Sequence, residues 1–288
     1  MTSASQVYAE QLFRLGHGYP LWDPEPATHP DIDGLDGEVH IGDVGFVDAS
    51  TGTFHRLFNA ILPADDDANK AGVPEGFKPF VQRSYGKVDK RGAIDARSLC
   101  SKAVKHTSAN GQVSIQGAGG GIEFQCTDEQ GAVLLLEEGA DREALLPSRR
   151  MANYMRQNYN SWVMFAQDQL DVDISREDLF FVRGHVKTKK WAVVAWIHEG
   201  RSAKLSFDGN FSSLANASLK VSYSSDVTVP PERNWGPKQD VQKKIKGKSR
   251  GKAHQTRETH KTDQCVFLNY YKLRVRLGFW PTVMKAAA

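Results

Sequence analysis

The sequence lacks the features that most directly indicate a membrane or secreted protein. No stretch approaches the roughly 20 consecutive apolar residues that a membrane-spanning helix needs. Met1–Glu10 contains neither a basic region nor an apolar core, so it does not resemble a secretory signal peptide. We therefore expect a cytoplasmic protein.

Cysteine is also scarce. The chain has three cysteines, Cys100, Cys126 and Cys265, and they are far apart in sequence. Without a CxxC spacing, neither a zinc knuckle nor a thioredoxin-type redox pair is indicated. An apolar residue lies within two positions of each cysteine, which is typical of free thiols buried as small hydrophobic groups in a reducing compartment.

Familiar catalytic and metal-binding motifs are absent as well. No serine lies in a Gly-x-Ser-x-Gly turn, and the nine histidines do not follow ligand spacing. The glycine run Gly117–Gly121 lacks the Lys-Ser/Thr pair of a phosphate loop. The acidic stretch from Asp65 resembles a calcium loop only at its start, because Lys70 and Gly76 occupy the positions of the required Gly and Glu. We predict no catalytic residue, metal or cofactor, although an active site assembled from distant residues stays open.

What the chain does have is one strongly basic segment, Lys238–Lys261. It carries nine Lys or Arg against Asp240 and Glu258, a net charge of +7, so the rest of the chain carries 3 − 7 = −4. Its only large apolar residues are Val241 and Ile245, too few to offset the entropy of ordering. We expect a disordered insertion (238–261) within a single domain of residues 1–288, because a strand pattern resumes after it.

The simplest interpretation of this segment is a solvated loop. The functional interpretation is attraction to anionic lipid, worth about 1 kcal/mol for each Lys or Arg near the surface. Nucleic acid is the weaker interpretation, because the segment has no aromatic residue on which bases could stack. The residues that we assign to lipid contact here are Lys243, Lys244, Lys246, Lys248, Arg250 and Lys252.

The periodicity predicts an α+β protein. Apolar residues recur at three-to-four spacing from Arg149 to Leu170, which predicts a long helix capped by Ser148. A shorter helix is expected over Ser5–Leu15. Alternating or densely apolar runs predict these strands: Glu38–Val47, Thr53–Leu62, Gln112–Gln116, Ile122–Thr127, Ala132–Glu137, Leu179–Val182, Trp191–Ile197, Leu205–Phe207, Leu219–Tyr223 and Cys265–Leu277. We expect a basic turn at Gly184–Lys190 and a mainly antiparallel, twisted sheet packed by the long helix.

Several short strings resemble a family of uncharacterised basidiomycete fungal proteins associated with NACHT-type immune receptors. They include Tyr19–Pro24 (YPLWDP), Ile41–Phe46 (IGDVGF), Gly184–Ala192 (GHVKTKKWA) and Leu277–Pro281 (LGFWP). The order of elements is also distantly similar to that of the gasdermin N-terminal, pore-forming domain. That order comprises a short first helix, a Trp-Pro loop, a Gly-Asp-Val strand, a central helix and a long last strand.

The resemblance implies a gasdermin-like fold and a role in cell death and innate immunity. Amphipathic hairpins would convert to membrane strands, which need roughly 9–11 residues each. Leu21 and Trp22 would occupy a lipid-binding loop, while basic residues meet anionic headgroups and the protein forms homo-oligomers on the membrane. The leading hypothesis is a non-enzymatic, pore-forming effector at anionic membranes. The alternative is a binding or scaffold module that engages protein or nucleic acid through the basic loop.

Overall fold

The computed structural model describes residues 3–30, 32, 35–82, 86–102, 104–107, 122–126, 129–197, 203–208, 220–223, 232–238, 261–274 and 282–286. Contacts divide the chain into two units. Unit 1 comprises Met1–Leu15, Ile94–Ala140 and Thr188–Gln264, and unit 2 comprises Gly16–Ala93, Asp141–Lys187 and Cys265–Ala288. Each unit is therefore built from three separate stretches of chain. That residues 1–288 behave as one domain stays a prediction.

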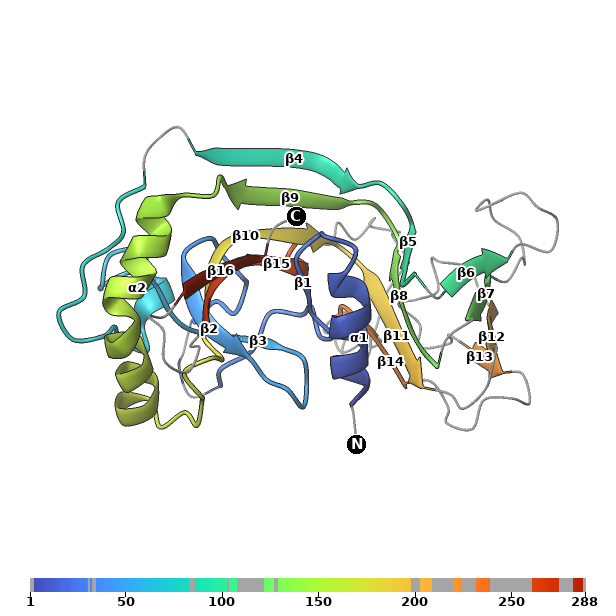
Figure 1. Cartoon of the computed structure of the whole chain (residues 1–288), viewed down its shortest axis with the longest axis horizontal. Coiled ribbons are helices and arrows are strands. Elements are labelled where there is room, and N and C mark those ends of the chain that lie inside the picture. Colours follow the sequence, from blue (N-terminus) through green and yellow to red (C-terminus); the bar gives the residue numbers. More distant parts are fainter. Residues whose placement is uncertain are drawn as a thin grey trace, which may run out of the picture. The chain divides into compact units, whose positions relative to one another are not determined.

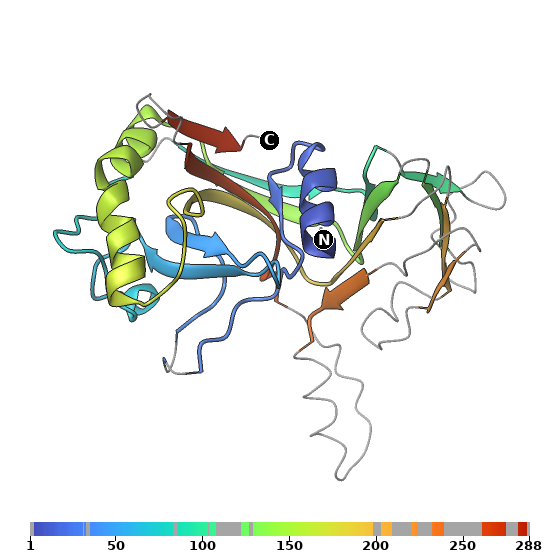
Figure 2. The same cartoon turned by 60° about the horizontal axis from the view of Figure 1, so that its bottom comes forward.

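Unit 2 is organised around a mainly antiparallel sheet (Figure 1). Its strands are β1 (Tyr19–Pro20), β2 (Asp43–Val47), β3 (Phe54–Asn59), β4 (Lys87–Ile94), β9 (Ala140–Leu145), β10 (Phe180–Thr188), β15 (Gln264–Arg274) and β16 (Thr282–Ala286). The main path runs β1-β15-β10-β2-β3; β16 also pairs with β15, β9 pairs with β10, and β4 pairs with β9. Figure 2 shows β16 beside β15.

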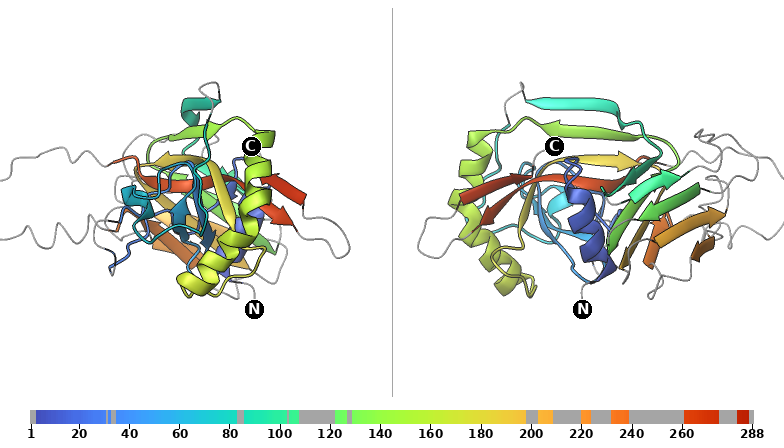
Figure 3. Two further views of the ribbon diagram at one scale, coloured as in Figure 1. Left: turned by 90° about the vertical axis from the view of Figure 1, so that its left-hand side faces the viewer. Right: turned by 45° about the vertical axis from the view of Figure 1, so that its right-hand side comes forward.

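The long helix of unit 2 forms where the sequence predicts it. The helix α2 spans Arg149–Met164 and continues as one wider, π-helical turn, Phe165–Gln169. The side chain of Ser148 accepts a hydrogen bond from the backbone N–H of Met151, so the predicted cap is confirmed. Figure 3 (left) shows α2 lying across the strands of the sheet.

The apolar stripe of α2 packs into a core with β2, β3, β10 and β15. Trp162 lies at its centre, with ring centroids 5.4 Å from Phe181 and 5.6 Å from Phe58 in edge-on arrangements. The buried members of this core are Val44, Leu57, Phe58, Ala60, Phe80, Leu145, Met151, Met155, Tyr159, Trp162, Val163, Phe165, Ala166, Ile174, Leu179, Phe181, Tyr271 and Leu273.

A buried hydroxyl joins the start of α2 to the sheet. The Tyr271 hydroxyl on β15 accepts from the Ser148 N–H at 2.7 Å and donates to the Ser148 carbonyl at 3.2 Å. Both backbone groups of the cap residue are thus satisfied by a side chain more than 100 residues away in sequence. The helix start is fixed by tertiary structure as well as by its own cap.

Unit 1 contains a short helix and two four-stranded sheets. The helix α1 spans Ala4–Phe13, close to the expected Ser5–Leu15; it is capped by Ser3 and packs against β8 and β11. One sheet has the order β14-β11-β8-β5 and the other β13-β12-β7-β6. The bounds are β5 (Ser98–Cys100), β6 (Val104–Thr107), β7 (Ile122–Cys126), β8 (Gln130–Leu136), β11 (Trp191–Ile197), β12 (Ala203–Asp208), β13 (Lys220–Tyr223) and β14 (Glu232–Gly236).

The predicted fold class is confirmed: the protein is α+β with mostly antiparallel sheets and one longer helix. Two local predictions are wrong. The strand expected over Glu38–Val47 forms only over Asp43–Val47, because residues 38–42 are held by side-chain contacts and not by strand pairing. Most of the expected basic turn, Gly184–Lys190, belongs to the buried strand β10, and only Lys189 and Lys190 separate that strand from β11. Gly184 is needed there because a β-carbon would lie 2.4 Å from the Ala144 side chain on β9. The predicted strand Gln112–Gln116 lies outside the described residues.

The core around Trp162 generates a stability prediction. Replacing this side chain, which is 1% exposed, with alanine should reduce the free energy of unfolding by about 3–5 kcal/mol because it leaves a large cavity. Met164→Ala, on the exposed side of the same helix, is the matched control and should change it by less than about 0.5 kcal/mol. Urea unfolding followed by circular dichroism measures both, and equal effects would contradict this packing.

Candidate functional sites

The two predicted lipid-contact residues in the Trp-Pro loop have different surroundings. Leu21 is 1% exposed and packs with Val39, Phe54 and Leu268 in a second core of unit 2. Its backbone N–H donates to the Val266 carbonyl on β15. Trp22 is only half buried and lies directly against Gly52. In this structure Leu21 can therefore reach a membrane only if β1 leaves β15.

The six basic residues assigned to lipid contact lie outside the described residues. They are Lys243, Lys244, Lys246, Lys248, Arg250 and Lys252. On either side of them the chain forms strands: β14 ends at Gly236, and β15 begins at Gln264. The Trp191 ring lies against Gly236, and its indole N–H donates to the Gln264 side chain at 2.9 Å. One indole on β11 therefore contacts the strands that flank the insertion, at Gly236 before it and Gln264 after it.

A buried group of charges in unit 2 is the first site that the sequence alone did not indicate. The Lys187 ammonium on β10 lies 2.7 Å from the Glu38 carboxylate, and these side chains are 7% and 11% exposed. Nearby, the Arg56 guanidinium on β3 lies 3.6 Å from the buried Asp43 carboxylate. Buried charges are costly unless they are paired, so the two ion pairs hold residues 38–43 against the sheet.

Asp43 has several further partners. Its carboxylate accepts hydrogen bonds from the His40 backbone N–H at 2.7 Å and from the Asn59 side-chain amide at 2.8 Å. Burial raises the pKa of Asp43, and the Arg56 charge opposes that shift. Arg56 also donates to the backbone carbonyls of Glu38 and Asp36. The acidic stretch before β2 is thus fixed mainly by one guanidinium.

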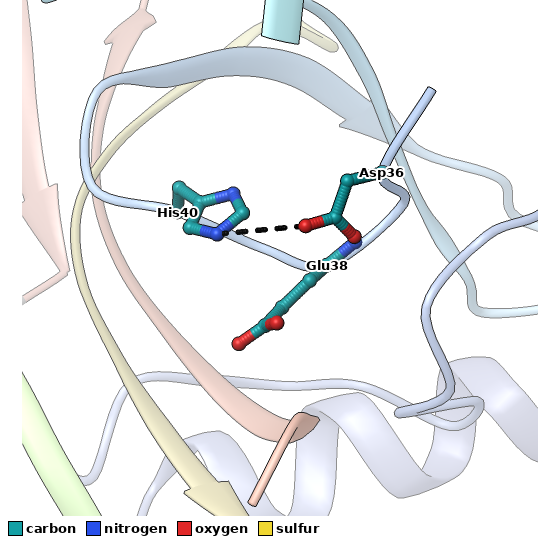
Figure 4. Close-up of side chains that lie close together, drawn as sticks. All are labelled: Asp36, Glu38 and His40. Carbon is teal, nitrogen blue, oxygen red and sulfur yellow. Dashed lines mark hydrogen bonds and ion pairs between the residues drawn. The ribbon is translucent and has the colours of Figure 1, made fainter. Parts of the chain in front are cut away.

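Asp36, Glu38 and His40 bring three possible metal ligands within 4.8 Å of one another (Figure 4). Their neighbours do not suit a cation. Glu38 is already paired with Lys187, and the His40 Nδ1 faces the Arg56 guanidinium at 3.2 Å. Since a guanidinium can only donate, Nδ1 must accept and the ring proton sits on Nε2, which faces Asp36 at 3.9 Å. A protonated nitrogen cannot bind a metal, so we assign this cluster a structural role.

His185 is a titratable group in the same unit. It is buried on β10 between Arg183 and Lys187, and its Nδ1 has no hydrogen-bond partner among the described residues. Burial, with a further contribution from the Lys187 charge, lowers the pKa of His185 to about 3. The imidazole is consequently neutral at physiological pH and is not poised for acid–base chemistry. Burial likewise raises the pKa of the Cys265 thiol to about 12, which keeps it protonated and unreactive.

An exposed surface forms where α2 and β4 begin, and we call it the α2–β4 patch. Figure 1 shows the two element starts close together. Leu146 donates its backbone N–H to the Gly86 carbonyl, and the Arg150 guanidinium lies over the Phe80 ring at 5.7 Å. The exposed apolar members are Val81 (72%), Leu146 (45%) and Val88 (44%). The exposed basic members are Lys78, Lys87, Arg149 and Arg150.

The patch combines three of the five large hydrophobic residues that are exposed among the described residues. Its charge is only partly compensated, because Lys87 pairs with Glu143 at 2.7 Å. Clustered apolar groups with a basic rim are typical of interaction surfaces. No helix within the described part of the chain is long and apolar enough to cross a bilayer.

The buried Lys187–Glu38 pair should contribute strongly to stability. Lys187→Met removes the ammonium beside a buried carboxylate and should reduce the free energy of unfolding by about 3–5 kcal/mol. The control is the neighbouring pair Lys189–Glu138, which is largely exposed, and Lys189→Met should cost less than about 1 kcal/mol. Chemical denaturation compares the two. The double variant Lys187→Met/Glu38→Gln should recover part of the loss, and no recovery would argue against the pair.

His185 should make stability depend on pH. Its pKa is about 3 in the folded protein, whereas an unfolded histidine titrates near 6.5. Below pH 6.5 the unfolded state binds a proton at His185 that the folded state does not bind. The contribution of His185 to the free energy of unfolding is therefore complete above pH 6.5 and decreases as the pH falls toward 3. The stability difference between wild type and His185→Gln should therefore shrink from pH 7 to pH 4 in denaturation experiments. A difference that stays constant would mean that His185 titrates normally in the folded state.

Neither a scan against protein-family models nor a search of curated proteins found a match for this chain.

Proposed function

We propose that this protein is a non-enzymatic effector that acts from the cytoplasm on anionic membranes and permeabilises them. The observation that carries the proposal is the α2–β4 patch, where the starts of α2 and β4 and the chain before them carry exposed Val81, Val88 and Leu146 together with Lys78, Arg149 and Arg150. Apolar side chains at such a surface enter the headgroup boundary, and each nearby cation adds about 1 kcal/mol of attraction to anionic lipid.

The small sheet β13-β12-β7-β6 supports the second part of the proposal. Its register aligns Phe124 with Leu205 and Leu205 with Tyr223, while the intervening positions are polar. Residues paired across antiparallel strands share a face of the sheet. The sequences of β7, β12 and β13 thus alternate apolar and polar residues as an inserting strand does, whereas β6 places His106 opposite Phe124. All four strands have 4–6 residues and would have to lengthen.

In this proposal the membrane is approached in two stages. The α2–β4 patch, with the basic segment 238–261, provides the first attraction to anionic headgroups. Trp22 joins the contact as an interfacial aromatic residue, and Leu21 follows only after β1 has separated from β15. Homo-oligomers then form on the membrane. Among the described residues, the buried charges Lys187 and Asp43 are paired, while His185 is neutral and Cys265 is protonated at physiological pH, so these groups lend no support to an enzymatic activity.

Liposome leakage tests the proposal. Wild type should release a trapped dye from vesicles containing phosphatidylserine or cardiolipin at low salt, and much less from pure phosphatidylcholine. Val81→Ser/Leu146→Ser should lower binding by roughly tenfold, because it removes two apolar contacts. Arg149→Glu/Arg150→Glu should have a similar effect because it reverses the charge of the patch.

Two control variants carry the same chemical changes away from the patch. Met164→Ser alters an exposed apolar residue at the opposite end of α2, and Arg176→Glu reverses a charge beyond that helix. Both should bind and permeabilise vesicles as wild type does. If wild type neither binds nor permeabilises anionic vesicles, the proposed function is wrong. If it loses a salt-sensitive protein or nucleic-acid partner when residues 238–261 are deleted, the scaffold alternative is favoured.

A further inference from the structure

The outer edge of β4 is an accessible strand edge. The strand β4 spans Lys87–Ile94, and its strand partner in the described part of the chain is β9. Every residue from Lys87 to Gly92 is exposed. Such an edge presents backbone N–H and C=O groups to solvent and can pair with another extended chain.

One backbone hydrogen bond at the start of β4 indicates which of its backbone groups face outward. The Gly86 carbonyl accepts from the Leu146 N–H, and the Gly92 N–H donates to the Asp141 side chain on β9. Gly86 therefore directs its backbone carbonyl toward the chain that continues from β9, and even-numbered residues between it and Gly92 share that direction. Along an antiparallel strand, the backbone N–H and C=O groups of successive residues point to opposite edges. The backbone groups of Lys87, Asp89 and Arg91 therefore point away from β9.

The charges on this edge indicate the kind of partner. Lys87, Lys90 and Arg91 against Asp89 give 3 − 1 = +2 over five residues. A second copy of β4 would bring like charges together, which disfavours self-association. An acidic segment would be attracted. The strand also contains no proline, and its first five residues precede the left-handed bend at Gly92 (φ +58°).

We propose that the β4 edge binds an extended, acidic peptide segment of a partner protein by adding it as a further strand. This inference goes beyond the proposed membrane function and concerns the protein in solution. The backbone groups of Lys87, Asp89 and Arg91 would provide the hydrogen bonds, while Lys90 and Arg91 would select acidic side chains. When a peptide adds to a sheet as a strand, backbone hydrogen bonds generally give the affinity and side chains give the specificity.

Asp89 permits a sharp test, because its replacement separates backbone pairing from charge. Asp89→Pro and Asp89→Ala remove the same negative charge, but only proline removes the outward N–H and obstructs an incoming strand. The probe is a fluorescein-labelled peptide of alternating Glu and Val, followed by fluorescence anisotropy with the full-length protein. Asp89→Ala should bind at least as tightly as wild type, and Asp89→Pro roughly tenfold more weakly than Asp89→Ala.

Peptide analogues keep the test independent of how the variant folds. An N-methylated version of the probe cannot donate its backbone hydrogen bonds and should bind wild type roughly tenfold more weakly. A Lys-Val counterpart should not bind, and Lys90→Glu/Arg91→Glu should reverse the preference between the two peptides. The proposal is overturned if wild type does not bind the Glu-Val probe, or if the N-methylated probe binds equally well.

Discussion

Burial of the Lys187 ammonium constrains more of unit 2 than any other contact described above. The strand β10 is inaccessible along all nine of its residues, including Arg183, His185 and Lys187. A cation in that position must have a counterion, and Glu38 supplies it from a stretch that has no regular secondary structure. Once Glu38 is fixed, His40 and Asp43 are brought beside Arg56. The turn into β2 is therefore a consequence of an electrostatic requirement on a strand almost 150 residues later.

The parts of the fold that could be predicted from sequence are those determined by local patterns. The helix α2 has a cap, Ser148, and an apolar stripe with helical periodicity, and both are local signals. The strand β11 is a dense run of aromatic and branched residues, which is a local signal as well. In α2 and β11 the local sequence pattern matches the residues that are buried in the core. The type and the approximate bounds of these two elements were therefore predictable.

Other parts depended on distant partners. Gly184, His185 and Lys187 have the composition of a turn, and only the contacts with Ala144 and Glu38 make them strand residues. The strand β4 has no apolar alternation because nearly all of it is exposed, so its pairing with β9 leaves no trace in its own sequence. The α2–β4 patch is similar, since Val81 and Leu146 lie 65 residues apart and neither is unusual in its local context. The one local signal for the patch was the pair Arg149 and Arg150 in the first turn of α2, which contains no acidic residue.

Trp191 has a further consequence for how this protein could change or be engineered. Because one rigid indole contacts Gly236 and Gln264, the two flanks of the insertion are set by β11 and β14, independently of what lies between them. The intervening sequence can therefore vary in length and charge without altering the strand register on either side. The same property makes this position a natural attachment point for a reporter domain, whose entry and exit spacing the scaffold already defines.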